Sequence, residues 1–219
     1  MPDRMNAIAV TPLVPESIHT RNDVPAPTLD EHGDGRGVLV KILQVGICGT
    51  DQEINLGLYG KAPPGYDYLV LGHEAVGQVA SIGPNVKQLK IGDIVTPTVR
   101  RPGKGRYDRM RFQDLTPNDA YFERGISEIH GFLCEYVCEH EEFLVKIEPK
   151  EVQDVGVLME PMSIVQKVVR AAWAVQEARL PFYSPRTAFI TGAGPIGQLA
   201  ALVLRMRGLN VVVTARRSR

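Results

Sequence analysis

The chain has 219 residues, of which 44% are hydrophobic and 23% are charged, a composition typical of globular domains that excludes intrinsic disorder. Its 25 lysines and arginines balance 25 aspartates and glutamates, so it lacks the net positive charge of a nonspecific nucleic-acid binder. No apolar run reaches the roughly 20 residues needed to cross a bilayer, and residues 1–10 lack the layout of a signal peptide. We expect a soluble, cytoplasmic protein with neither nucleic acid nor membrane as a partner.

Short strand-like segments dominate the first two-thirds of the chain. They are rich in valine and isoleucine and are bounded by glycine, proline and other turn residues. Strands are predicted at residues 7–10, 37–45, 74–82, 93–99, 131–138 and 143–147. The pattern predicts a β-rich, barrel-like domain, interrupted at residues 100–124 by an exposed lobe rich in arginine, glycine and proline.

Candidate metal ligands lie on two turns of this β-rich region and at its end. Cys48 lies on the first turn, His73 and Glu74 on the second, and Glu160 where the composition changes. Sulfur, nitrogen and oxygen donors together suit zinc, and a catalytic zinc takes about three protein ligands. Cys48, His73 and Glu160 would suffice, with Glu74 as a direct or water-mediated ligand. Alternatively, each is an ordinary core or surface side chain.

The chain holds three cysteines, an odd number that argues against a disulfide framework and suits a reducing compartment. Cys134 and Cys138 fall four residues apart in the predicted strand 131–138, which places their Cα atoms about 13 Å apart. That distance is too long for a disulfide, so we interpret both as core thiols.

The pattern changes to alternating helices and strands after Pro161. A long helix is predicted from Pro161 to a point before Pro181, because apolar residues recur at helical spacing. A strand at 187–190, a helix at 198–207 and a second strand at 210–214 follow. The apolar positions of the long helix are Met162, Val165, Val168, Val169, Ala172 and Val175.

A glycine-rich turn separates the strand at 187–190 from the next helix. Its residues include Gly192, Gly194, Pro195, Ile196 and Gly197. In this context the three glycines permit a tight turn, a close approach of the backbone to a pyrophosphate and close packing of helix on strand. The turn predicts dinucleotide binding, although the glycines alone would also fit a purely structural turn.

A basic run follows the second strand of this unit. An NAD-specific site places an acidic residue there to bind the ribose 2′-hydroxyl, whereas this chain has Arg216 and Arg217. Guanidinium groups match a 2′-phosphate, so the sequence favours NADP over NAD. The alternative is that the run is simply solvated.

Three ordered motifs resemble the zinc-dependent medium-chain dehydrogenase/reductase family. The resemblance covers residues 6–217, and segments 123–126, 130–132, 135–136, 160–161 and 215–217 are similar to those of its archaeal-type glucose dehydrogenases. The motifs are Gly72-His73-Glu74 with Gly77, Gly83 and Val86, then Cys48-Gly49-Thr50-Asp51, and then Gly192, Gly194 and Gly197.

The resemblance implies an α/β protein with two parts. Residues 1–161 would form a GroES-like, β-rich zinc catalytic domain. Residues 162–219 would form a linking helix and the first βαβ unit of an incomplete Rossmann domain. Its implied reaction is hydride transfer from an aldose, glucose at C1, to NADP; polyols or L-threonine are alternative substrates of the same family.

The resemblance also implies roles for individual residues. Zinc would be bound by the three predicted ligands, with Glu74 as an exchanging or water-bridged ligand. Thr50 would relay the proton, and Asp51 would accept a hydrogen bond from His73. Glu135 would contact sugar hydroxyls.

The chain departs from the family in two respects. It has no cysteine between Cys48 and Cys134, so we expect one catalytic zinc and no structural zinc. We expect the arginines of the lobe to be solvated; pairing with Asp108, Asp114 or Asp119 is the alternative.

The second departure is length, because the chain stops after the second strand of the nucleotide-binding fold. We expect a truncated form or fragment with little activity, or a non-catalytic scaffold or dimerisation partner. A full-length form is expected to be a homo-oligomer.

Overall fold

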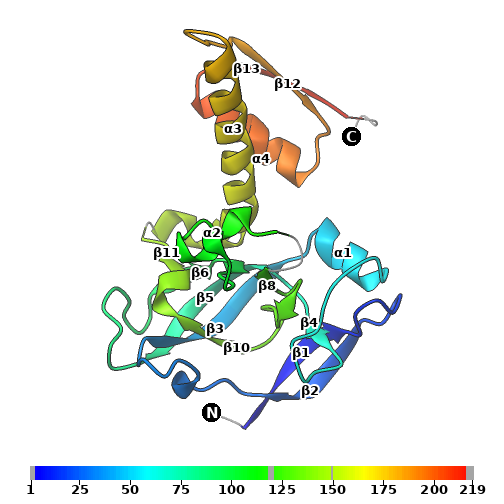
Figure 1. Cartoon of the computed structure of the whole chain (residues 1–219), viewed down its shortest axis with the longest axis vertical. Coiled ribbons are helices and arrows are strands. Elements are labelled where there is room, and N and C mark those ends of the chain that lie inside the picture. The colour runs from blue at the N-terminus through cyan, green and yellow to red at the C-terminus, as the bar shows by residue number, and fades with distance from the viewer. Residues whose placement is uncertain (1–2, 118–120, 149, 216–219) are drawn as a thin grey trace. The chain divides into compact units, whose positions relative to one another are not determined.

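The chain folds into two units in the computed structural model, which describes residues 3–117, 121–148 and 150–215. The first unit spans Met1–Val157 and the second spans Leu158–Arg219; Figure 1 colours them in chain order. The units divide after Val157, earlier in the chain than the boundary expected after Pro161. The expected boundary lies inside a long helix.

A five-stranded antiparallel sheet forms the larger part of the first unit (Figure 1). Its strand order is β10-β3-β5-β6-β11, and alternate apolar side chains of these strands pack around the buried ring of Phe132. β3 and β5 pair from Val38 opposite Ile82 to Gly46 opposite Glu74. The strands are β3 (Gly37–Gly46), β5 (Glu74–Ile82), β6 (Ile94–Pro97), β10 (Tyr136–His140) and β11 (Leu144–Lys146).

A second sheet of three strands has the order β2-β1-β4. Alternate residues of β1 point inward, where Met5, Ala7 and Ala9 pack in a small core with Tyr68 and Val70. The sequence predicted only β1, because β2 is mostly polar and β4 is very short. The strands are β1 (Arg4–Val10), β2 (His19–Pro25) and β4 (Leu69–Val70).

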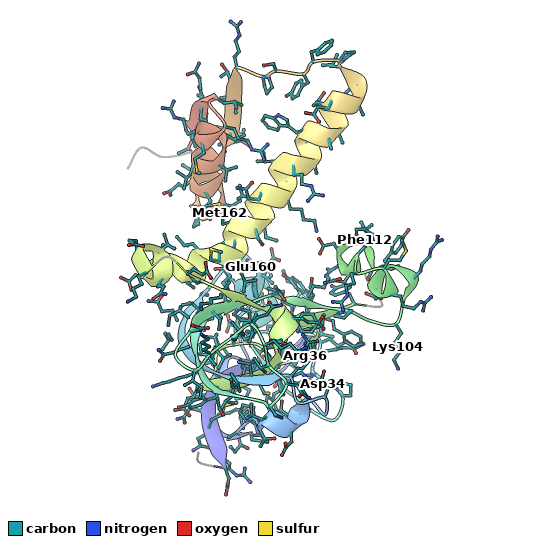
Figure 2. The ribbon with its side chains drawn as sticks, turned by 90° about the vertical axis from the view of Figure 1, so that its left-hand side faces the viewer. Asp34, Arg36, Lys104, Phe112, Glu160 and Met162 are labelled. Atoms are coloured by element: carbon teal, nitrogen blue, oxygen red, sulfur yellow. The ribbon has the colours of Figure 1, made fainter. Side chains whose placement is uncertain are left out.

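The predicted lobe, residues 100–124, holds two short strands and two helical turns, and a third short strand follows it. The strands form a sheet of order β7-β8-β9, and Lys104 and Phe112 lie in the part that stands out from the main sheet (Figure 2). The elements are β7 (Arg100–Arg101), α2 (Arg106–Arg109), β8 (Phe122–Arg124) and β9 (Glu128–Ile129).

The second unit is a helix followed by a strand–helix–strand unit. β12 and β13 are parallel, with Thr187 opposite Asn210 and Thr191 opposite Thr214, and a shared core joins them to both helices. The predicted order of a β-rich part and then a βαβ unit is confirmed. The elements are α3 (Met159–Arg179), β12 (Thr187–Thr191), α4 (Pro195–Met206) and β13 (Asn210–Thr214).

One predicted strand needs correction, and the predicted long helix is confirmed. The first half of the strand predicted at 131–138 is not part of β10, because residues 131–133 bond to the segment before His73 instead. The apolar positions that indicated α3 divide into two sets: Val165 and Val169 are buried, whereas Val168 and Val175 are exposed. Helical spacing alone did not separate these two sets.

Cys134 and Cys138 pack inside the first unit, and all three cysteines of the chain are free. Cys138 is fully buried and Cys134 partly so. Burial raises the pKa of both thiols to about 12, so they stay protonated at neutral pH. Among the residues that the structure describes, no helix has both the length and the apolar character that crossing a membrane requires.

Candidate metal centre

The first ligand-bearing turn places Cys48 between β3 and α1 (Gly49–Asn55). Cys48 is the N-cap of α1, and its sulfur accepts the backbone N–H of Thr50 at 3.2 Å. In return, the carboxylate of Asp51 accepts the N–H of Cys48 at 3.0 Å. This reciprocal arrangement satisfies two N–H groups of the helix start and fixes the position of the thiol.

The second turn carries His73 and Glu74 into β5. Gly72 has a φ of +87°, a left-handed conformation that favours glycine, and an added Cβ would lie 2.8 Å from Val45 Cγ1. His73 follows and is 5% exposed. Glu74 lies opposite Gly46, whose missing side chain leaves room for the Glu74 carboxylate.

Asp51 connects the two turns. Its second carboxylate oxygen accepts the N–H of Gly72 at 3.2 Å, so one buried side chain binds both ligand-bearing backbones. The Nδ1 atom of His73 lies 3.7 Å from Asp51 Oδ1, an ion-pair distance rather than a hydrogen bond. Asp51 also holds the backbone of the residue that precedes His73.

Three predicted ligand side chains converge between these turns. The sulfur of Cys48 lies 3.2 Å from His73 Nε2, and one ligand atom each of Cys48, His73 and Glu74 lie within 4.8 Å of one another. Sulfur and nitrogen ligands bound to one tetrahedral zinc lie about 3.5 Å apart, from the usual bond lengths. The donor set and its spacing therefore fit a zinc ion.

The surroundings shift the ionisation of two of these groups. Burial opposes ionisation of Cys48, but hydrogen bonds with the side chains of His73 and Thr50 outweigh it, so the pKa of the thiol is lowered. Burial raises the pKa of Glu74. A divalent cation would stabilise both ionised forms.

Glu160 lies in the first turn of α3, two residues before Met162 (both labelled in Figure 2). It belongs to the second unit, whereas Cys48, His73 and Glu74 belong to the first. Its role as a zinc ligand stays a prediction.

Glu135 precedes β10 and is exposed. Its Oε2 atom accepts the backbone N–H of Asn6 at 2.8 Å and the Asn6 side-chain amide at 3.4 Å. The carboxylate thus braces β1, and the predicted sugar contact stays a prediction.

The glycine-rich turn lies between β12 and α4. Gly192 has a φ of +106° and donates its N–H to Thr214 at the end of β13. Gly194 is the N-cap of α4 and Pro195 opens the helix, while the backbone of Gly197 lies against the Gly192 carbonyl. Arg216 and Arg217 lie outside the described residues.

The expected solvation of the lobe arginines is wrong for Arg100 and Arg101, which are mostly buried in ion pairs, whereas Arg111 forms an ion pair but stays exposed. Their partners are glutamates rather than the aspartates named as the alternative, and Asp119 lies outside the described residues. Asp108 instead accepts bonds from the Gly105 N–H and the Thr116 hydroxyl. The ion pairs are Arg100–Glu123 at 2.6 Å, Arg101–Glu139 at 2.7 Å and Arg111–Glu142 at 2.5 Å.

Two models of known protein families match this chain. Residues 34–149, more than half of the chain, match the alcohol dehydrogenase GroES-like domain. The chain belongs to that family. Residues 153–219 of this GroES-like family member match the glucose dehydrogenase C-terminus.

Individual relatives agree with both matches. The chain is 46% identical to glucose 1-dehydrogenase of Thermoproteus tenax, in a match that covers 97% of this chain and 58% of the relative. It is 44% identical to glucose 1-dehydrogenase of Methanocella arvoryzae, in a match that covers 98% of this chain and 58% of the relative. The glucose dehydrogenase of Haloferax mediterranei, solved with NADP, Zn and gluconolactone, is 38% identical with a TM-score of 0.85; the match covers 98% of this chain and 59% of that one. This GroES-like family member thus spans less than two-thirds of the length of these relatives.

Tyr59 is a site neighbour that the sequence did not reveal. It lies in the loop after α1, and its hydroxyl interacts with the side chains of Thr50 and Glu53. Burial raises the pKa of Tyr59, so the hydroxyl is protonated at neutral pH. A lone tyrosine in a loop carries no pattern that would have identified it.

Proposed function

We propose that the chain is the zinc-binding part, with the first nucleotide-binding unit, of an NADP-preferring dehydrogenase that oxidises an aldose, glucose at C1. The convergence of the Cys48, His73 and Glu74 ligand atoms carries the proposal. It is supported by the similarity to glucose 1-dehydrogenases and to a structure that contains NADP, Zn and gluconolactone.

The chain's own residues would hold the metal and move the proton. Cys48 as thiolate, neutral His73 and Glu74 would hold zinc, which when bound polarises a substrate hydroxyl and lowers its pKa. Thr50, on the same helical turn as Cys48, would accept the hydroxyl proton and pass it towards solvent. The adjacent Tyr59 hydroxyl would hold the Thr50 side chain in place.

Sugar recognition would need further acceptors near the metal. Glu135 is the predicted one, and its Oε1 atom would accept a sugar hydroxyl while Oε2 stays with Asn6. A substrate without such hydroxyls would leave a carboxylate unpaired, which selects against simple alcohols.

NADP would bind at the turn that runs from Gly192 to Gly197. The start of α4 would face the pyrophosphate, and Arg216 and Arg217 would pair with the 2′-phosphate. One such charge-assisted contact favours NADPH over NADH by roughly ten- to a hundredfold. Fluorescence titration with the two cofactors tests this preference, and equal affinity would contradict it.

Zinc affinity separates the two carboxylate candidates. Removing a true ligand weakens metal binding strongly, so Glu74→Gln and Glu160→Gln can be compared directly in the full chain. We expect Glu74→Gln to bind zinc at least tenfold more weakly, an effect as large as that of losing an outer-shell partner. An equal loss in Glu160→Gln would make it a ligand too; no loss would remove it from the proposed set.

The remaining expectations concern setting and assembly. We place the reaction in the cytoplasm, since the three cysteines are free, as a reducing compartment would leave them. We also propose that a longer form of the chain self-associates as a homo-oligomer, which sedimentation would test.

The decisive assay for the reaction is NADPH formation with glucose, polyols and L-threonine as candidate substrates. We expect zinc-dependent NADPH formation with glucose, at a low rate in this chain, and none in Cys48→Ser. Stoichiometric zinc without reduction on any substrate would favour the non-catalytic alternative. Absence of stoichiometric zinc would overturn the proposal.

A further inference from the structure

A buried ionic group lies at the base of the lobe, and we call it the Glu139 group: Glu139, Arg101 and Arg124. Glu139, on β10, is 1% exposed. Its Oε2 lies 2.7 Å from Arg101 Nη2 and its Oε1 lies 2.6 Å from Arg124 Nε. Burying three charged side chains is costly, and apolar residues of similar volume often stabilise a fold equally or better. Stability alone therefore does not account for the group.

Arg124 uses its remaining nitrogens to hold backbone. Its Nη1 donates to the carbonyl of His130 at 3.0 Å, and its Nη2 donates to the carbonyl of Cys138 at 3.3 Å. The guanidinium thus links β8 to β10 and to the segment that ends at His130. Glu139 lies against the same guanidinium and forms an ion pair with its Nε atom.

The residues that directly follow Arg124 and His130 both pack on Gly72. Gly125 directly follows Arg124 with a φ of +71°, and a Cβ there would collide with the Gly72 backbone. Gly131 directly follows His130 and approaches the same carbonyl. Phe132 then donates its N–H to the Gly72 carbonyl at 2.9 Å.

Gly72 is the residue before His73, and its own N–H is bound by Asp51. The turn that aims His73 is therefore held from two sides. Asp51 holds it from the turn of Cys48, and residues 125–132 hold it from the lobe. A small shift of the second support would move the imidazole relative to the Cys48 sulfur.

We propose that the Glu139 group is a positioning device for the metal centre, which sets the place of His73 through residues 125–132 and Gly72. This inference rests on the proposed zinc site. The group acts through the backbone, so it is not catalytic. Its loss should weaken zinc binding and alter the coordination geometry even where the chain stays folded.

The test compares Glu139→Gln with a matched control, Glu141→Gln, in the full chain. Glu141 is also buried and accepts Arg36 (labelled in Figure 2) at 2.8 Å and the N–H groups of Lys87 and Gln88. None of these partners belongs to the path from Glu139 to Gly72. The two variants therefore remove equivalent carboxylates from the same unit.

Zinc affinity from chelator competition and the visible bands of bound Co²⁺ are the two readouts. Glu139→Gln should bind zinc about 10–100-fold more weakly, as loss of outer-shell support does, and should change the Co²⁺ bands. Glu141→Gln should keep the zinc affinity and the Co²⁺ bands of the unaltered chain, even if urea unfolding shows a lower free energy of unfolding. If Glu139→Gln fails to fold, Arg124→Lys, which keeps the charge but loses the fork, takes its place.

Unchanged zinc affinity and Co²⁺ bands in folded Glu139→Gln would overturn the inference, as would equal losses in both variants. Failure of the unaltered chain to bind zinc is a separate result. It would overturn the zinc site itself, and the positioning role with it.

Discussion

Asp51 is the side chain on which both ligand-bearing turns depend. Asparagine at this position has one acceptor oxygen, so it can accept the N–H of Cys48 or of Gly72 but not both. The other N–H is left unpaired, at a cost of about 1–3 kcal/mol of unfolding free energy. We expect Asp51→Asn also to weaken zinc binding about 10–100-fold, measured by chelator competition.

Asp108→Asn provides the comparison for Asp51. Asp108 is likewise a buried aspartate that accepts a backbone N–H, from Gly105, but it lies in the lobe. Its variant should keep the zinc affinity of the unaltered chain. A loss of affinity as large in Asp108→Asn as in Asp51→Asn would contradict the specific role of Asp51.

The reactivity of the three thiols should differ in a defined order in the zinc-free chain. The pKa of Cys48 is lowered, mainly by its hydrogen bond from His73 working against burial, whereas the pKa values of Cys134 and Cys138 are raised to about 12. The thiolate is the reactive form. As the pH rises from acid, alkylation by iodoacetamide should therefore begin at Cys48, and zinc should protect it.

Peptide mass spectrometry over a pH series reads out all three sites at once. Cys134 and Cys138 act as internal controls, since both remain protonated until the pH approaches about 12. Alkylation of Cys48 no faster than Cys138, or no protection by zinc, would contradict this order.

The sequence predicted individual site residues where a short local motif contained the metal-binding side chains. Cys48, His73 and Glu74 were recognisable because each lies beside turn residues in a family-like order. The partners of the lobe arginines were not, because Glu139 lies on β10, 38 residues from Arg101. The spacing of residues along the chain does not predict an ion pair between residues that only the folded structure brings together.

The turn between β4 and β5 is the structural element that the metal centre requires most. At Gly72 a side chain would be strained by the positive φ and would also press on Val45 and Leu133, at 2.8 and 2.9 Å. Gly92→Ala isolates the first effect, since Gly92 has a φ of +93° and open space around it.

We expect Gly92→Ala to cost about 1–2 kcal/mol of unfolding free energy with zinc affinity unchanged. Gly72→Ala should cost about 1–3 kcal/mol more, from overpacking, and should weaken zinc binding. Urea unfolding of the zinc-free chain and chelator competition measure the two effects. Similar costs for the two variants, with no change in zinc binding, would show that the packing around Gly72 does not matter.

Elements were predictable where the pattern was long or bounded by clear signals. The strands at 37–45 and 74–82 and the βαβ unit were found because β-branched runs or a glycine turn marked them. β2 was missed because a polar strand with a single fully buried residue, Val24, has no apolar alternation. α4 begins at Pro195, earlier than predicted, since Gly194 caps it.

At the scale of the whole molecule, the second unit exposes apolar side chains on its strands. Phe189 on β12 is 64% exposed and Val212 on β13 is 48% exposed, whereas Val211 packs against the core of the unit. Exposed apolar patches bind hydrophobic dyes and promote association. The double variant Phe189→Thr/Val212→Thr should lower dye binding and light scattering.

Stability should respond differently at the two faces of the strand pair. The double variant should change the unfolding free energy by no more than about 0.5 kcal/mol per site, because surface positions contribute little. Val211→Thr should destabilise the chain and leave dye binding undiminished. Unchanged dye binding in the double variant would show that the exposed strand face is not the source of association.

Zinc K-edge absorption of the full chain, loaded with one equivalent of zinc, tests the metal centre most directly. We predict one sulfur neighbour at about 2.3 Å together with nitrogen or oxygen neighbours at about 2.0–2.1 Å, and loss of the sulfur in Cys48→Ser. Zinc that fails to bind stoichiometrically, or that binds with no sulfur neighbour, would contradict the account.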